Sequence, residues 1–186
     1  LSQAYFDLRY EEQLQDPVGF NIRDVLPEAR REVGSNFAYW PRHKTVVLIY
    51  SADSFRRLRQ GTPEWVAGQY DGKIRVPLPG KEFDAEHVRG ILVHEYTHAL
   101  VHDLTKNRCP QWFNEGLATY EEMKRATPPL DQLSNAAATK QLLSWDRLND
   151  QFAWGLPADQ VAMGYQQSYS IIRYLVERYG FWRIRR

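Results

Sequence analysis

The pattern of apolar and polar positions changes character near the middle of the chain. In the first half, apolar and polar residues alternate between Tyr5 and Tyr10, and the run from Thr45 to Tyr50 is β-branched and apolar. Alternation over a few residues is typical of a half-buried strand, and a short apolar run is typical of a buried one. We therefore expect strands over both segments, with the second in the centre of a sheet.

A hairpin is expected between Val66 and Leu78. Asp71-Gly72 is a dipeptide that tolerates the positive φ of a tight turn. The strand expected after it, over 73–78, contains Pro77, which cannot donate a ladder hydrogen bond. We therefore expect this strand at the edge of the sheet.

Helical spacing dominates the second half. Apolar residues recur every three or four positions from Ala85 to about Lys106, which predicts one long helix, and Cys109-Pro110 ends it. Other helices are expected over 21–37, 53–60, 111–125 and 161–179, the last closed by Gly180, and 132–149 is expected to hold one or two short helices with a loop between them. A small mixed sheet followed by helices indicates the α+β class. We interpret 1–186 as one domain, mainly sheet over 1–84 and helical over 85–186.

Composition and charge narrow the classes of function. The 186 residues are 43% hydrophobic and 25% charged, which is ordinary for a globular chain with a core. The 24 Lys and Arg against 23 Asp and Glu leave a net charge of +1, so no strong field favours nucleic acid, and we expect no nucleic-acid partner. The single cysteine excludes an intramolecular disulfide framework. No apolar run approaches the roughly 18 residues of a membrane span, so none is expected in this chain.

Candidate chemistry is concentrated in His94-Glu95-Tyr96-Thr97-His98, inside the long predicted helix. Helical residues four apart lie about 40° apart around the axis, so both imidazoles can face one ion. Catalytic zinc takes three protein ligands and keeps one open position. Glu95 lies about 100° round the helix from His94, which places its carboxylate beside that open position as a general base. A helix that carries two histidines by chance is the alternative reading.

Three residues are candidates for the third ligand. His102 continues the same helical face, but its Cα would lie about 12 Å from that of His94 along a straight helix, and Asp103 points to another face. Glu115 lies on the next predicted helix, which the break before Pro110 allows to fold back against the first. We therefore predict Glu115 as the third ligand to one Zn²⁺. The alternative is an acidic residue favoured in a first turn by the helix dipole.

His94-Glu95-x-x-His98 and Trp112-Phe113-Asn114-Glu115-Gly116-Leu117-Ala118 together resemble the gluzincin clan of zinc metallopeptidases. More narrowly, they resemble the bacterial peptidase-MA-like domains, which are often attached to tetratricopeptide repeats. Segments 68–77 and 165–180 resemble that family's strand before the active-site helix and its closing helix. The resemblance implies a zincin-like fold, His94, His98 and Glu115 as zinc ligands, Glu95 as general base, a peptide or protein substrate, and a repeat domain linked upstream.

The resemblance also implies roles for residues around the metal. The strand over 73–78 would line the cleft at the sheet edge, where an extended peptide could add by main-chain pairing, with Ile74 and Val76 as the substrate-binding residues. Tyr165 is the candidate donor to the oxyanion, and Tyr169, one turn later, is the second choice. Core packing of the two rings is the alternative for both.

One position departs from the thermolysin pattern. There, an aspartate four residues after the glutamate ligand orients a zinc-binding histidine, but this chain has Thr119 at that position. The orienting group is then either Thr119 or a more distant residue such as Glu122, and the sequence leaves both open.

We therefore expect zinc-dependent hydrolysis of peptide bonds. The alternative is a catalytically inactive zincin-like module that binds peptides or serves a structural role in a larger protein. Intact Glu95 argues against it, because a structural zinc site has no use for a base and fills its fourth position. A zinc hydrolase acting on another substrate also stays open.

The chain begins with Leu1, so we expect that upstream sequence was removed or left out. No signal determines the localisation, and a bacterial envelope or secreted location is favoured over the cytoplasm.

Overall fold

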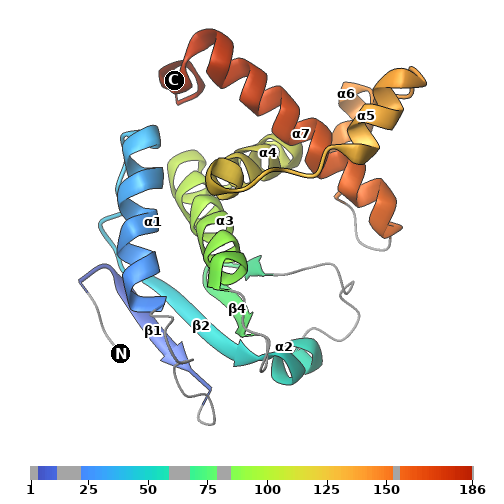
Figure 1. Cartoon of the computed structure of the whole chain (residues 1–186). Coiled ribbons are helices and arrows are strands. Elements are labelled where there is room, and N and C mark those ends of the chain that lie inside the picture. The colour runs from blue at the N-terminus through green and yellow to red at the C-terminus, as the bar shows by residue number, and fades with distance from the viewer. Residues whose placement is uncertain (1–3, 12–21, 59–67, 79–84, 153–155, 186) are drawn as a thin grey trace.

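The computed structural model describes residues 4–11, 22–58, 68–78, 85–152 and 156–185, which form a small sheet followed by a helical part (Figure 1). The strands are β1 (Phe6–Tyr10), β2 (Thr45–Ser51), β3 (Gln69–Tyr70) and β4 (Ile74–Leu78). The helices are α1 (Ile22–Phe37), α2 (Ala52–Leu58), α3 (Ala85–Thr105), α4 (Gln111–Glu122), the 3₁₀ helix η1 (Met123–Arg125), α5 (Asp131–Ala138), α6 (Trp145–Asp150), α7 (Ala158–Tyr179) and α8 (Phe181–Ile184). The α+β class expected from the sequence is confirmed.

The sheet has the strand order β1-β2-β4-β3 within the described residues. β1, β2 and β4 are parallel to one another, and β3 pairs antiparallel with β4. β2 therefore lies inside the sheet, as its continuous apolar run predicts. The hairpin between β3 and β4 turns where expected, because Gly72 adopts a φ of +90° and the Asp71 N–H donates to the carbonyl of Lys73.

The prediction that β4 is the edge strand is wrong. All five residues of β4 pair with β2 on one side. On the other side, β3 pairs with Ile74 and Arg75 of β4, so β3 is the outermost described strand. Pro77 is compatible with this position because the described pairing with β3 stops before it. Pro77 indeed lacks a donor for a second neighbour, but a proline does not reveal that a strand as short as β3 pairs with the residues before it.

Helix α3 lies at the centre of the molecule. It contacts α1, β4 and α4, and every residue from Ile91 to Val101 except His94 is buried. Its inner side packs on the sheet, where the rings of Phe6 and Tyr96 meet edge to face with centroids 5.6 Å apart. A helix that is apolar around most of its circumference is one that is covered on most sides. The position of α3 is therefore fixed by the core itself.

The helical part folds back over α3. α4 follows the break at Pro110 and packs against both α3 and α7. Gly116 allows the close contact with α7, because a Cβ there would lie 2.8 Å from the backbone oxygen of Ser168. Gln166 and Gln167 of α7 hold the segment around α5 in place, since their side-chain oxygens accept hydrogen bonds from the backbone N–H groups of Leu133 and Leu143. α7 ends at Gly180, as expected, where φ is +77°.

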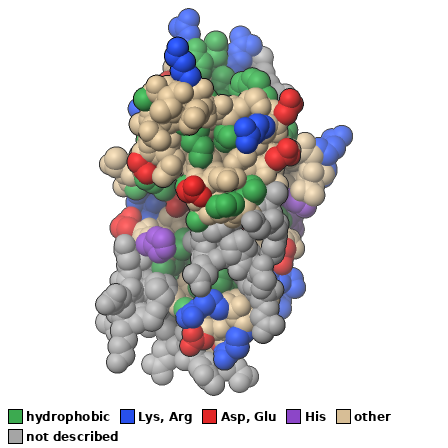
Figure 2. All heavy atoms as spheres, turned by 90° about the vertical axis from the view of Figure 1, so that its right-hand side faces the viewer, with side chains coloured by type: hydrophobic (Ala, Val, Ile, Leu, Met, Phe, Trp, Pro, Cys, Tyr) green, Lys and Arg blue, Asp and Glu red, His purple; other side chains and the backbone are tan. Residues whose placement is uncertain are grey.

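The outer face on the side of α5 and α7 is mixed in character. Figure 2 shows acidic and basic side chains interspersed over the described part of this face. Among the helices in the described ranges, none combines the length and the apolar character that crossing a membrane requires.

Candidate metal centre

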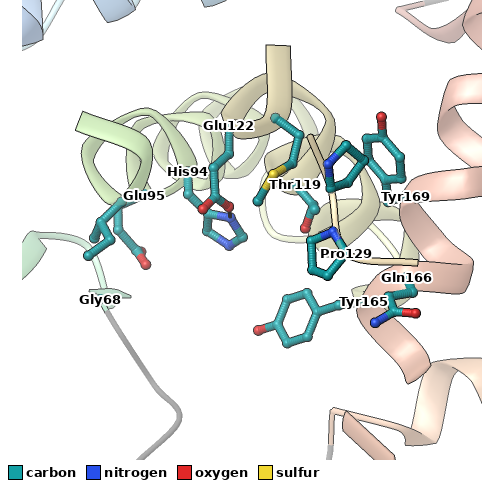
Figure 3. A pocket seen from close by; sticks show the side chains of 12 residues that line it. Gly68, His94, Glu95, Thr119, Glu122, Pro129, Tyr165, Gln166 and Tyr169 are labelled. Atoms are coloured by element: carbon teal, nitrogen blue, oxygen red, sulfur yellow. Dashed lines mark hydrogen bonds and ion pairs between the residues drawn. The ribbon is translucent and has the colours of Figure 1, made fainter. Parts of the chain in front are cut away.

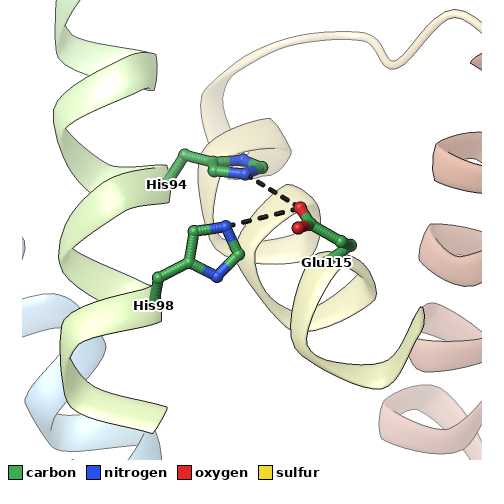
Figure 4. A group of neighbouring side chains, drawn as sticks. All are labelled: His94, His98 and Glu115. Carbon is green, nitrogen blue, oxygen red and sulfur yellow. Dashed lines mark ion pairs between the residues drawn. The ribbon is translucent and has the colours of Figure 1, made fainter. Parts of the chain in front are cut away.

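Two imidazoles from α3 and one carboxylate from α4 meet at one point (Figure 4). The Nε2 atoms of His94 and His98 each lie 3.4 Å from Oε2 of Glu115. The side chains of all three residues are between 11% and 13% exposed, so the point where they meet is largely shielded from solvent. Potential ligand atoms of the three residues all lie within 4.8 Å of one another. The structure thus brings together the three ligands predicted from the sequence.

The spacing of these atoms fits a tetrahedral metal ion. Two ligands at 2.0–2.1 Å from zinc, at a tetrahedral angle, lie about 3.3–3.4 Å apart. The contacts with Glu115 are longer than ordinary hydrogen bonds, and within the described residues its buried Oε2 makes none. A buried carboxylate oxygen without a hydrogen bond is costly unless a cation completes its environment. Nitrogen and carboxylate ligands in a His₂Glu set are also those of catalytic zinc.

The charges of the three residues are strongly coupled. Burial lowers the pKa of His94 and of His98, but nearby carboxylates outweigh it and raise both pKa values above the ordinary value: Glu115 and Glu122 act on His94, and chiefly Glu115 acts on His98. Burial raises the pKa of Glu115, but the two imidazoles outweigh it and hold that pKa well below its usual range. Glu115 is therefore ionised at neutral pH, as a metal ligand must be.

Glu122 orients His94. Its Oε2 lies 2.8 Å from Nδ1 of His94, and because a carboxylate only accepts, Nδ1 carries a proton and Nε2 is the nitrogen that can give its lone pair to a metal, once its own proton is lost. Thr119 does not share this role, since its buried hydroxyl makes no hydrogen bond within the described residues. The choice that the sequence left open therefore falls on Glu122.

Glu95 lies beside the cluster but is not part of it. It is 5% exposed, on the turn of α3 that carries His94. Gly68, just before β3, lies against it, and a Cβ on Gly68 would come within 2.7 Å of Oε1 of Glu95. The sheet edge thus reaches the candidate base, and the absence of a side chain at position 68 makes this approach possible.

A pocket of about 220 Å³ opens next to His94 and Glu95 (Figure 3). Tyr165 and Tyr169 both line it, but the Tyr165 hydroxyl points toward the gap between Glu95 and His94, whereas the Tyr169 hydroxyl points away. The ring of Tyr165 packs edge to face on Phe152 with centroids 5.1 Å apart, and its centroid lies 6.3 Å from that of His94. Burial and the nearby carboxylates raise the pKa of Tyr165 well above its ordinary value, so the phenol stays protonated.

Other sequence candidates lie away from the metal cluster. The side chains of Ile74 and Val76 are fully buried in the core, so these two residues could meet a substrate only through their main chain. His102 packs its ring on Tyr70 with centroids 5.6 Å apart, in keeping with its exclusion as a ligand. Burial raises the pKa of the Cys109 thiol to about 11, so the thiol is protonated at neutral pH.

Sequence reasoning missed the apolar wall of the pocket. Ile91, Met123, Pro128 and Pro129 line it; Ile91 lies beside Glu95, one turn earlier on α3, whereas Pro129 lies across the pocket. The signal that was available is the spacing of Ile91, three residues before His94 and hence on a neighbouring part of the same helical face.

Comparison with known proteins points to one family. The model of the peptidase MA superfamily matches residues 63–185, about two thirds of the chain, and this range includes α3, α4 and α7. Searches of curated proteins and of solved structures gave no match. The matched range contains the whole cluster, its orienting glutamate and the pocket. This chain belongs to the peptidase MA superfamily.

Proposed function

We propose that this chain is a zinc-dependent peptidase of the gluzincin type, with His94, His98 and Glu115 holding one Zn²⁺. The observation that carries the proposal is the meeting of two imidazoles and an ionised carboxylate at the spacing of zinc ligands. Membership of the peptidase MA superfamily and a zincin-compatible α+β fold support it. An open pocket beside the cluster leaves space for a substrate, which a purely structural zinc site does not need.

Glu95 would act as the general base. When bound, zinc supplies a Lewis acid that polarises a carbonyl and lowers the pKa of a coordinated water. Glu95 is buried on the same turn of α3 as His94 and faces the pocket, so its carboxylate can take a proton from the attacking water. It would then return that proton to the amine of the leaving peptide.

Tyr165 would stabilise the negative charge that develops on the carbonyl oxygen. Its hydroxyl points toward the gap between Glu95 and His94, and its raised pKa keeps it a hydrogen-bond donor at neutral pH. Tyr169 is the weaker choice, because its hydroxyl points out of the pocket and its ring packs near Tyr120, with centroids 6.4 Å apart.

The main chain of Gly68–Tyr70 would align an extended peptide. β3 is the outermost described strand, and Gly68 lies directly beside Glu95. Pairing of a peptide with this segment would lead its backbone past the general base. This role replaces the one expected for Ile74 and Val76, whose strand lies further inside the sheet.

The test compares metal content and hydrolysis in four proteins. The parent and Glu95→Gln should each contain about one equivalent of zinc, and His98→Ala should contain little. Hydrolysis of a mixed peptide library should fall about 10²–10⁴-fold in Glu95→Gln, because the proton acceptor is lost while the ligands stay. Glu86→Gln, the same change at an exposed position of α3, is the control and should behave as the parent.

Two results would contradict the proposal. Peptide cleavage by Glu95→Gln at the parent rate would remove Glu95 as the base. A parent that binds zinc but cleaves no peptide in the library would instead favour the inactive peptide-binding module.

A further inference from the structure

The pocket is continuous with the candidate catalytic residues. His94, Glu95 and Tyr165 form one side of it. A substrate side chain that enters the pocket would therefore belong to a residue next to the peptide bond that reacts. Its far side is built by Met123, the first residue of η1 after α4, and by Pro128-Pro129, which follow η1. The position of this far side is fixed by ion pairs from Arg125 to Glu28 and Glu32 of α1, each at 2.6 Å.

Most of the pocket wall is apolar. Met123, Pro128 and Pro129 on the far side and Ile91 of α3 present hydrocarbon and thioether surfaces, and the ring of Tyr169 adds an aromatic face. Gln166 also lines the pocket, but its amide is engaged with the Leu133 N–H and the Asp131 carboxylate. The polar group that Thr119 contributes is one buried hydroxyl. An apolar side chain therefore finds contacts on most of the wall.

Charged side chains fit poorly. The carboxylates of Glu95 and Glu122 both line the pocket, so an acidic side chain would meet like charges. A basic side chain would have to give up its water to an apolar wall, and Oε2 of Glu122 is already bonded to His94. Like charges thus disfavour an acidic side chain, and the cost of desolvation opposes the attraction that the two carboxylates exert on a basic one.

The size of the pocket matches one large side chain. A protein cavity of about 150 Å³ holds a benzene molecule. A pocket of about 220 Å³ therefore accommodates leucine, methionine or phenylalanine and is much larger than alanine needs.

We propose that this pocket is the side-chain specificity pocket of the peptidase, and that it takes a large uncharged apolar residue next to the bond that is cut. Met123, together with Ile91, sets its width. The inference rests on the proposed function and extends it by naming the class of substrate.

The experiment uses the zinc-loaded chain and a peptide library whose cleavage sites are mapped by mass spectrometry. Leucine, methionine or phenylalanine should dominate one of the two positions that flank the cleaved bond. In a series of peptides that differ only there, kcat/KM should be about 30-fold higher for leucine than for alanine or for asparagine, which has nearly the same shape as leucine. The glutamate peptide should be cut at least about 100-fold more slowly than the leucine peptide.

Shortening the wall at Met123 tests the residue that sets the width. Met123→Ala should raise the ratio of kcat/KM for phenylalanine over leucine about tenfold, because the wider pocket favours the larger ring. Leu104→Ala removes a similar apolar side chain from an exposed position of α3 and should leave that ratio unchanged. The ratio does not depend on how much of each variant is folded. An unchanged ratio in Met123→Ala would overturn the role of Met123.

A binding measurement separates this inference from the proposed function. Zinc-loaded Glu95→Gln should bind the leucine peptide about 30-fold more tightly than the asparagine peptide, measured by calorimetry. Selective binding without any cleavage by the parent would refute the peptidase and keep the pocket assignment. Cleavage or binding without preference at either flanking position would refute the pocket assignment and leave the peptidase standing.

Discussion

Replacing Glu122 tests whether the carboxylate behind His94 contributes to metal affinity. The 2.8 Å contact with Nδ1 of His94 is a charge-assisted hydrogen bond, of a kind worth about 1.5–3 kcal/mol. The Glu122 side chain is 24% exposed, so we take the lower part of this range, about 2 kcal/mol. Glu122→Gln keeps an acceptor but removes the charge, which about halves the energy and weakens zinc binding about fivefold. Glu122→Ala removes the contact and should weaken zinc binding about 30-fold.

Competition with a chromophoric chelator gives the zinc dissociation constants of the parent and both variants. Glu121→Gln is the matched control: it changes the neighbouring carboxylate, which accepts hydrogen bonds from Asn36 at 2.9 and 3.0 Å instead of contacting a histidine. It should leave the zinc affinity unchanged, although loss of the buried ion pair with Lys124 should lower the unfolding temperature. A zinc dissociation constant in Glu122→Ala within a factor of two of the parent would refute the orienting role.

Tyr165→Phe removes the hydroxyl group but keeps the aromatic ring packed on Phe152, so kcat should fall about 100-fold while the zinc content stays at one equivalent. An unchanged kcat would exclude Tyr165 from the reaction. Gly116→Ala places a methyl group 2.8 Å from the backbone oxygen of Ser168 and from Ile172, and should lower the free energy of unfolding in urea by about 2 kcal/mol. An unchanged urea midpoint would mean that α4 and α7 can separate at no cost.

The parts of the site that were predictable from sequence are those set by one helix. The spacing of His94 and His98 places both imidazoles on one face whatever surrounds α3, and the break at Pro110 allows Glu115 to return to them. Glu122 could not be chosen over Thr119, because the choice depends on how α4 is rotated against α3. That rotation follows from side-chain packing between the helices, which no periodicity records.

The fold shows the same division. Most helices and strands begin and end close to their expected positions, because apolar periodicity and glycine or proline at the ends are local signals. The predicted position of β4 at the edge of the sheet was wrong. The order of the strands depends on β2, which is distant in sequence, and on β3, which has only two residues. The apolar wall of the pocket was missed for a similar reason: Met123 and Pro128-Pro129 meet Ile91 only after α4 folds back.

The burial of α3 on nearly all sides ties the chemistry of this protein to its overall cooperativity. The candidate ligands on α3 and the candidate base belong to the segment whose backbone amides should exchange with solvent most slowly, because they open only when the whole molecule does. Local fraying therefore cannot inactivate this part of the site. Heat should abolish activity and tertiary structure in a single transition, and sheet substitutions that never approach the metal should still act on catalysis through one rigid helix.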